Sequence, residues 1–242
     1  MEKGNSRIAI VLGSRGRPLR LESFIKSLQE TADDPSSYRV YIYVDDDDEP
    51  TIKYSKELKE TYDRLVFHIG PRIIMSDMVN KLYPHTSEGI IYLGGDDLIM
   101  RTQGWDSTVI DAYSECEDKI LLCYGKDGGE AQRMHLADPT CFATHPIISR
   151  RWVEIQGCVT PSCFSCDYAD TWLNDLADDL GRKKKLPIYN EHMHWSLGKS
   201  PLDRTYVENR QRFQKDNVIK KYDRMKEERQ QVLKKLKEAL IC

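Results

Sequence analysis

Several features that would assign a chain to a class at once are missing from this sequence. No apolar run approaches the ~20 residues that a membrane-spanning helix needs. Residues 1–7 are polar and lead directly into an apolar run, so no signal peptide is expected. The seven cysteines are an odd number without the pattern of a small disulfide scaffold, which favours a reducing compartment. Internal repeats are also missing, and these absences together predict a cytoplasmic protein.

Composition is that of an ordinary globular protein. The 242 residues suffice for one large domain with a substantial core, at 40% hydrophobic and 31% charged residues. The net charge of −3 conceals an asymmetry, because residues 199–242 carry 13 basic and 7 acidic side chains. A basic tail on an acidic body indicates an anionic partner such as nucleic acid or a membrane surface. A solvated helix with mixed charges would have the same composition.

Strands and helices alternate along the first half of the chain. Apolar runs of strand length occupy residues 8–12, 40–44, 65–69, 90–93 and 119–124. Apolar residues with helical spacing, or segments of helical propensity, occupy residues 19–28, 54–62, 73–83 and 103–116. This order predicts a mainly parallel α/β sheet with helices on both faces.

The pattern loosens after Gly125. Residues 126–139 are expected to be a loop, followed by a short strand, two helices and a strand at 140–143, 150–156, 169–180 and 186–195. From about Thr205 the chain is charged and helical in propensity. Its sparse apolar stripe consists of Val218, Tyr222, Met225, Val232, Leu236 and Leu240. Because so few apolar residues cannot build an independent core, the last three are expected to pack against the domain or a second subunit.

The most informative stretch runs from Ile90 to Asp97, where an apolar strand ends at two adjacent carboxylates. Gly94 and Gly95 allow the backbone to turn sharply there. Because ligands of open α/β sheets bind outside the carboxyl ends of the strands, Asp96 and Asp97 stand where a site is expected. Two carboxylates there are candidate ligands for Mg²⁺ or Mn²⁺ held against nucleotide phosphates. The alternative is that they cap the next segment.

A histidine pair is the second chemical feature. His192 and His194 lie two apart on an expected strand and so share a face. Either imidazole would complete a metal site begun by Asp96 or Asp97, since Mn²⁺ accepts mixed nitrogen and oxygen ligands. A structural role is the alternative. Lys199 follows closely and is suited to neutralise a diphosphate.

Two loops at strand ends carry further candidates. Four carboxylates, residues 45–48, follow the second strand and repel one another unless something compensates them. A base or ribose that needs hydrogen-bond acceptors would do so, although many such runs are solvated turns. The first strand-to-helix loop contains Ser14, Arg15 and Arg17, and its arginines and backbone N–H groups suit an anionic ligand.

Asp167 and Asp170 stand at the start of an expected helix. A carboxylate there is usually an N-cap, but it is also a candidate general base for an acceptor hydroxyl. The nearby cysteines make a rival case for zinc, which rests on one C-x2-C pair without a second at the required spacing; they are Cys158, Cys163 and Cys166.

The order of these features resembles a glycosyltransferase of the GT-A fold, similar to the family 2 type. Val44-Asp45-Asp46 resembles the nucleoside-binding element of that family. The stretch from Leu93 to Asp97 resembles the DxD motif that carries metal and nucleotide sugar, with Gly94 in place of the leading carboxylate. Ala169-Asp170-Thr171 resembles the ED element that supplies the base, with its glutamate lost. The likeness extends over residues 7–199.

The resemblance implies a Rossmann-like GT-A domain at residues 1–204, followed by a basic helical extension at 205–242. It implies an enzyme that moves a sugar from a nucleotide donor, in the first place a UDP-sugar, to a hydroxyl acceptor with inversion. Mn²⁺ or Mg²⁺ would be held by Asp97 or Asp96 with His192 or His194. Asp170 would be the base, with Asp167 in reserve. The implied donor site is Ser14, Arg15, Arg17, Asp45, Asp46, Asp96 and Lys199.

Several alternatives stay open at this level. A metal-dependent nucleotidyltransferase also needs carboxylates and a basic loop, but it attacks phosphorus rather than a sugar carbon. A nucleic-acid-binding protein without enzymatic activity would use the basic tail. A polyanionic acceptor is one candidate, with modified DNA as an example, and the C-terminal helix offers a surface for an oligomer.

Overall fold

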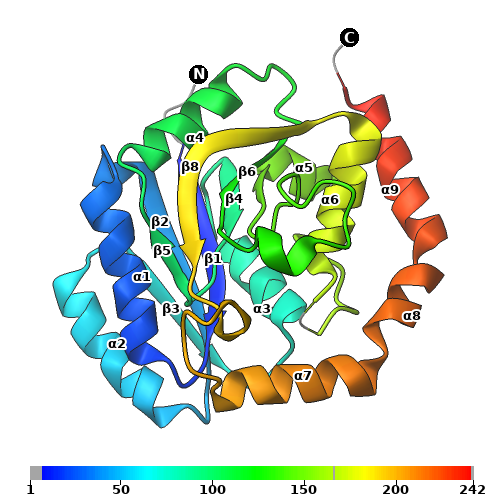
Figure 1. Cartoon of the computed structure of the whole chain (residues 1–242). Coiled ribbons are helices and arrows are strands. Elements are labelled where there is room, and N and C mark those ends of the chain that lie inside the picture. The colour runs from blue at the N-terminus through cyan, green and yellow to red at the C-terminus, as the bar shows by residue number, and fades with distance from the viewer. Residues whose placement is uncertain (1–6, 166, 241–242) are drawn as a thin grey trace.

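The computed structural model describes residues 7–165 and 167–240. Within them, eight strands form one sheet in the order β3-β2-β1-β4-β7-β6-β8-β5. The strands are β1 (Ile8–Ser14), β2 (Tyr38–Asp45), β3 (Leu65–Gly70), β4 (Ile90–Leu93), β5 (Leu98–Met100), β6 (Leu122–Lys126), β7 (Ile147–Ser149) and β8 (Lys183–His192). They form a curled, mostly parallel centre with helices on both sides (Figure 1).

The half of the sheet built from β3, β2, β1 and β4 is parallel throughout, as the sequence predicts. Three helices connect these strands: α1 (Pro18–Thr31), α2 (Glu49–Thr61) and α3 (Met75–Leu82). Proline stands in the first turn of both α1 and α2, where its missing N–H is not needed. Asp48 also caps α2 by accepting a hydrogen bond from the backbone N–H of Thr51.

The other half of the sheet is mixed, and it differs from the sequence expectations. The expected strand at 140–143 is wrong, because those residues are loop and β7 lies at Ile147–Ser149 instead. β8 begins and ends three residues earlier than the expected 186–195. β5 was not expected, since three residues are too few to show a period of two. It pairs antiparallel with the end of β8.

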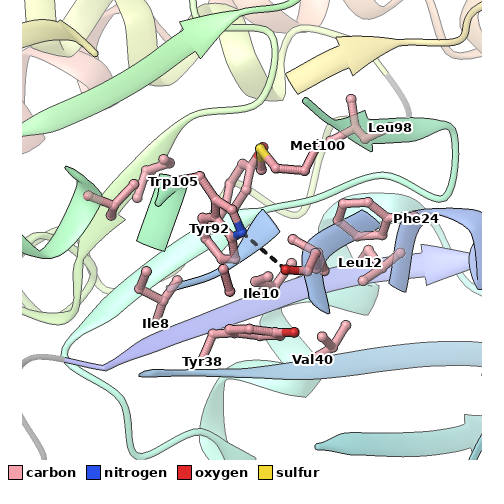
Figure 2. Close-up of a cluster of buried hydrophobic side chains, with 14 of the residues drawn as sticks. Ile8, Ile10, Leu12, Phe24, Tyr38, Val40, Tyr92, Leu98, Met100 and Trp105 are labelled. Carbon is pink, nitrogen blue, oxygen red and sulfur yellow. Dashed lines mark hydrogen bonds between the residues drawn. The ribbon is translucent and has the colours of Figure 1, made fainter. Parts of the chain in front are cut away.

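Alternate residues of the strands feed two hydrophobic clusters, one on each face of the sheet. Ile8, Ile10 and Leu12 of β1 face α1, α2 and α4 (Trp105–Ser114). Ala9 and Val11 face the side of α3, α5 (Arg150–Gln156) and α6 (Ala169–Leu180). In the first cluster Trp105 is fully buried near Tyr38 and Tyr92 (Figure 2). Burial on both faces explains why the central strands are continuously apolar.

The C-terminal extension is three helices rather than one: α7 (Arg204–Asp216), α8 (Val218–Arg224) and α9 (Lys226–Glu238). Asn217 separates the first two with a left-handed φ of 48°. The three helices follow the edge of the molecule from the lower end of the sheet to α6 (Figure 1). Val232 and Leu236 are buried against α5 and α6, and Leu240 packs at the margin of the same cluster. The expectation that these residues pack on the domain is confirmed.

None of the helices in the described part of the chain combines the length and apolar character needed to cross a membrane.

Candidate functional site

A cavity of about 740 Å³ opens where β1, β2 and β4 end. Ser14, Asp45 and Leu93 line it from these three strands, as expected for the carboxyl edge of a parallel sheet. Further walls come from α3, the loop before β7, the start of α6, the residues after β8 and one face of α7. The candidate residues at the edge of the sheet and those at the start of α6 therefore line the same cavity.

Asp96 is buried and both of its oxygens are engaged. Ser14 Oγ donates to Oδ2 at 2.9 Å, and Arg17 Nη1 donates to Oδ1 at 3.1 Å. Burial raises the pKa of Asp96, while the Arg17 guanidinium opposes that rise. The backbone at Gly94 lies very close to the side chain of Ile10, because a Cβ on Gly94 would be only 2.9 Å from Ile10 Cγ2. A side chain in place of Gly94 would therefore displace the loop that carries Asp96.

Asp97 has a different environment from its neighbour. The Tyr206 hydroxyl donates to Asp97 Oδ2 at 2.7 Å, and His192 Nε2 lies 3.3 Å from the same oxygen. Burial favours the neutral acid, but these hydrogen bonds and the nearby imidazoles hold the pKa of Asp97 below its usual range. Asp97 is therefore a carboxylate at neutral pH.

A third imidazole lies beside this pair. His145 lines the cavity, and its ring meets that of His192 edge-on with centroids 5.0 Å apart. Burial lowers the pKa of His145 to about 4, so the ring is neutral at pH 7. Its Nε2 is buried without a hydrogen-bond partner among the described residues. Such a nitrogen lone pair is chemically suited to a metal or a ligand donor group.

The side chains around Asp97 carry oxygen and nitrogen atoms of the types that bind a divalent metal. These atoms do not yet surround a single point where an ion could sit. Among residues 7–165 and 167–240, no three His, Cys, Asp or Glu side chains already have ligating geometry. His192 stands at the end of β8, whereas His194 caps the short 3-10 helix at Trp195–Leu197 and accepts from the Ser196 N–H. The carboxylate of Asp97 and the free Nε2 of His145 fit an ion whose other ligands come from a diphosphate and water.

The carboxylates that follow β2 differ in burial and in their position relative to the cavity. Asp45 is buried and lines the cavity, with Arg15 Nη1 3.0 Å from its Oδ2. Its Oδ1 is buried and accepts no hydrogen bond from the described residues. Asp46 is exposed and does not line the cavity. Of these two candidates only Asp45 presents an acceptor where a nucleoside would lie.

The two candidates for the general base, Asp170 and Asp167, also have different environments. Asp170 lines the cavity from the first turn of α6, and burial raises its pKa to about 6. The Thr171 N–H donates to its Oδ1 at 2.8 Å. Asp167 lines the same cavity but is exposed, and its nearest cation is Arg210 at 3.9 Å. Burial raises the pKa of Asp167 as well, so Asp170 is distinguished by its half-buried side chain, which is typical of a general base.

Two other candidates lie elsewhere. Lys199 is not among the residues that line the cavity, and its Nζ forms an ion pair with Glu191 Oε1 at 2.7 Å. The zinc hypothesis depends on Cys166, which lies outside the described residues. Cys163 meets the sulfur of Met225, which lies between α8 and α9, and no group of three metal-ligating side chains forms among the described residues.

The sequence interpretation missed Tyr206, His145 and the arginines that α7 contributes to the cavity, Arg210 and Arg212. Tyr206 lies 109 positions from Asp97 along the chain. No local pattern predicts such a contact, because α7 carries too few apolar residues to show which face is covered. His145 lies in the loop before β7, where the strand was expected too early.

Comparisons with known proteins support the fold. Neither a protein-family model nor a curated protein matches the sequence. Among solved structures, the chain is similar to the mannosyltransferase PcManGT from Pyrobaculum calidifontis in complex with GDP-Man and Mn²⁺, with a TM-score of 0.62 and 14% identity over 77% of this chain. It is similar also to TarS 1-349 from S. aureus in complex with UDP-GlcNAc, with a TM-score of 0.56 and 10% identity over 84% of this chain.

These structural similarities identify the fold class of the chain. The curled, mostly parallel sheet between two layers of helices is a GT-A-like α/β fold. At such low identity the likeness concerns the fold alone. The aligned part covers 56% of the mannosyltransferase chain and 64% of the TarS chain, so this chain spans less than two thirds of either.

Proposed function

We propose that the protein is a metal-dependent glycosyltransferase that moves a sugar from a nucleotide donor to a hydroxyl acceptor. The observation that carries this proposal is the shared cavity of Asp97 and Asp170. Asp97 is an ionised carboxylate near the neutral imidazole of His145, and Asp170 is a carboxyl group with a raised pKa. One group suits a metal and a diphosphate, and the other suits proton transfer.

The donor would lie along the ends of β1, β2 and β4. Asp45 Oδ1 offers an acceptor to the base or ribose, and the N–H and guanidinium donors of the loop after β1 suit the phosphates. Asp97 and His145 would hold Mn²⁺ or Mg²⁺, with His192 free to join once it leaves Asp97. A bound divalent ion offsets the charge that develops on the leaving diphosphate.

Asp170 would accept the proton of the acceptor hydroxyl. The acceptor oxygen forms a bond to the anomeric carbon, and the bond from that carbon to the diphosphate oxygen breaks. The diphosphate leaves with the electron pair of that bond. Because the acceptor attacks from the side opposite the leaving group, this displacement inverts the anomeric centre. Asp97 and His145 would lie on the side of the leaving diphosphate, where they would hold the ion.

The finer assignments are part of the same proposal. The similar structures hold GDP-Man or UDP-GlcNAc, and a UDP-sugar is our first choice of donor. Arg210 and Arg212 of α7 line the cavity, and their positive charges support an anionic acceptor such as modified DNA. A cytoplasmic location, a boundary near residue 204 and an oligomer through the C-terminal helices stay predictions from the sequence.

A nucleotide-sugar hydrolysis screen with and without Mn²⁺ tests the proposal. Many transferases hydrolyse their donor slowly when no acceptor is present, so at least one UDP- or GDP-sugar should release free sugar and nucleoside diphosphate. Asp97→Asn should abolish the metal-dependent part, whereas Asp178→Asn, an exposed carboxylate on α6, should not. Release of pyrophosphate from a nucleoside triphosphate would indicate a nucleotidyltransferase instead. Salt-sensitive nucleic-acid binding that survives Asp97→Asn, without any hydrolysis, would indicate a binding protein.

A further inference from the structure

A tyrosine of the C-terminal extension is hydrogen-bonded to the carboxylate that we assign to the metal. The Tyr206 hydroxyl lies 2.7 Å from Asp97 Oδ2, and His192 Nε2 contacts the same oxygen at 3.3 Å. Both contacts are made by Oδ2 of the Asp97 carboxylate, and neither involves Oδ1. The carboxylate of this cavity-lining residue is thus anchored through Oδ2, while Oδ1 takes part in neither contact.

The hydroxyl of Tyr206 is held in place by its surroundings. The Arg17 guanidinium lies over the ring at 3.9 Å from its centroid, and the His194 ring meets it edge-on at 4.6 Å. Arg17 is itself fixed by a bidentate pair with Asp203, at 2.8 Å from both Nε and Nη2. Asp203 caps α7 by accepting from the Tyr206 N–H. Tyr206 is therefore a rigid donor rather than a mobile surface side chain.

The direction of the hydrogen bond follows from the charges. An ionised carboxylate can only accept a hydrogen bond, so the Tyr206 hydroxyl, which is protonated at neutral pH as tyrosines ordinarily are, is the donor in this contact. Arg20 Nη1, 3.3 Å away, points a donor at the oxygen of the same hydroxyl. A hydrogen bond to an ionised acceptor is stronger than one between neutral groups.

We propose that Tyr206 is a positioning residue that orients Asp97 so that Oδ1 is presented to the divalent metal. This inference depends on the proposed function, because it assumes a metal at Asp97. Carboxylates that ligate metals are commonly oriented by a second hydrogen bond, and loss of that bond typically weakens metal binding by about 10–100-fold. The C-terminal extension would then be part of the donor site and not only a cover for α5 and α6.

A purely structural role for the hydroxyl predicts a different result. Tyr206→Phe keeps the ring, and with it the contacts to Arg17 and His194, but removes the donor to Asp97. If the hydroxyl only satisfied a buried carboxylate, the variant would lower thermal stability without a specific change in metal affinity. If it positions Asp97, the affinity for Mn²⁺ changes by more than the loss of stability explains.

The experiment measures Mn²⁺ affinity in the presence of saturating UDP or GDP by electron paramagnetic resonance, together with the melting temperature. Tyr206→Phe should bind Mn²⁺ about 10–100-fold more weakly than the wild type. The matched control is Tyr222→Phe, which removes another tyrosine hydroxyl bonded to a carboxylate, that of Asp175, away from the cavity. The control should bind Mn²⁺ as the wild type does.

The outcomes separate the two proposals. Equal Mn²⁺ affinity in wild type and Tyr206→Phe would overturn the positioning role and leave the proposed function standing. Weakening in both tyrosine variants would also overturn it, because the effect would then reflect general destabilisation. A wild type that binds no Mn²⁺ with either nucleotide would contradict the metal site itself, and the positioning role with it.

Discussion

At the scale of single residues, the cavity contains carboxyl groups in three different states. Asp96 is paired on both oxygens, Asp97 is ionised with one oxygen engaged, and Asp170 has a raised pKa. Adjacent residues in a strand-end loop therefore perform different tasks, since one supports the loop and the other faces the ligand. Asp45, at the end of β2, has a buried Oδ1 that would suit the nucleoside of the proposed donor.

The base assignment predicts a specific pH dependence. The ionised carboxylate is the active form of a base, so the transfer rate of the wild type should rise with pH through about 6, where Asp170 loses its proton. Asp170→Asn should retain donor affinity while transfer falls by about 10²–10⁴-fold. Steady-state kinetics from pH 5 to 8 measures both effects.

Asp178→Asn serves as the control, because this exposed residue lies on the same helix but outside the cavity. Transfer by Asp170→Asn within a few-fold of the wild type would reduce Asp170 to a helix-end residue. Asp167→Asn would then be the next variant to measure.

The sequence indicated the carboxylates but not their partners. Asp96 and Asp97 were predictable because a buried strand followed by glycine fixes where a loop emerges from a sheet. Tyr206 and His145 were not, because their proximity to Asp97 depends on how distant segments pack. The separation of Asp45 from Asp46 was also hidden, since only the end of β2 decides which carboxylate turns inward.

At the scale of elements, the C-terminal helices have two distinct functions in the architecture. α7 forms one wall of the cavity, whereas α8 and α9 complete the hydrophobic cluster on the face of α5 and α6. Deleting residues 206–242 would therefore expose a core surface and remove Tyr206 at the same time. Point substitutions separate the two roles more cleanly than a truncation.

The packing of α9 predicts a large loss of stability on truncating a buried side chain. Leu236 is fully buried, so Leu236→Ala should lower the free energy of unfolding by about 2–5 kcal/mol. Lys237→Ala, at the next and exposed position, should change it by about 0.5 kcal/mol or less. Urea denaturation of the two variants measures the difference. Similar small losses in both would show that α9 does not contribute to the core.

From the arginines of α7 we expect this helix to affect the binding of the acceptor and not the hydrolysis of the donor. Arg212 lines the cavity without an ion-pair partner among the described residues, so it is available to an anionic acceptor. With such an acceptor, Arg212→Ala should raise the acceptor KM by about tenfold, the loss of about 1.4 kcal/mol. Donor hydrolysis without acceptor should be unchanged.

Lys235→Ala, an exposed position on α9, is the control for the loss of one positive charge. The difference between the two variants should shrink as salt is raised, because screening weakens the interaction that Arg212 contributes. An acceptor KM that responds equally to both substitutions would assign the effect to overall charge.

At the scale of the whole molecule, the order of elements was the most predictable property. The alternation of apolar runs gave the parallel half of the sheet correctly, because those strands are buried on both faces. In the mixed half, a strand was misplaced at residues 140–143, near the three-residue strand β7, and the three-residue strand β5 was not expected. Short strands of this kind are defined by their partners in the sheet and not by their own sequence.

The central claim is that a divalent metal and a nucleotide bind together at Asp97, and one measurement tests it most directly. Crystals of the protein grown with Mn²⁺ and UDP or GDP, measured near the manganese absorption edge, locate the ion by its anomalous signal. The account predicts a single peak at about 2.0–2.6 Å from a carboxylate oxygen of Asp97, with the diphosphate bound to the same ion. A nucleotide in the cavity with Mn²⁺ away from Asp97 and from all three nearby histidines would contradict it.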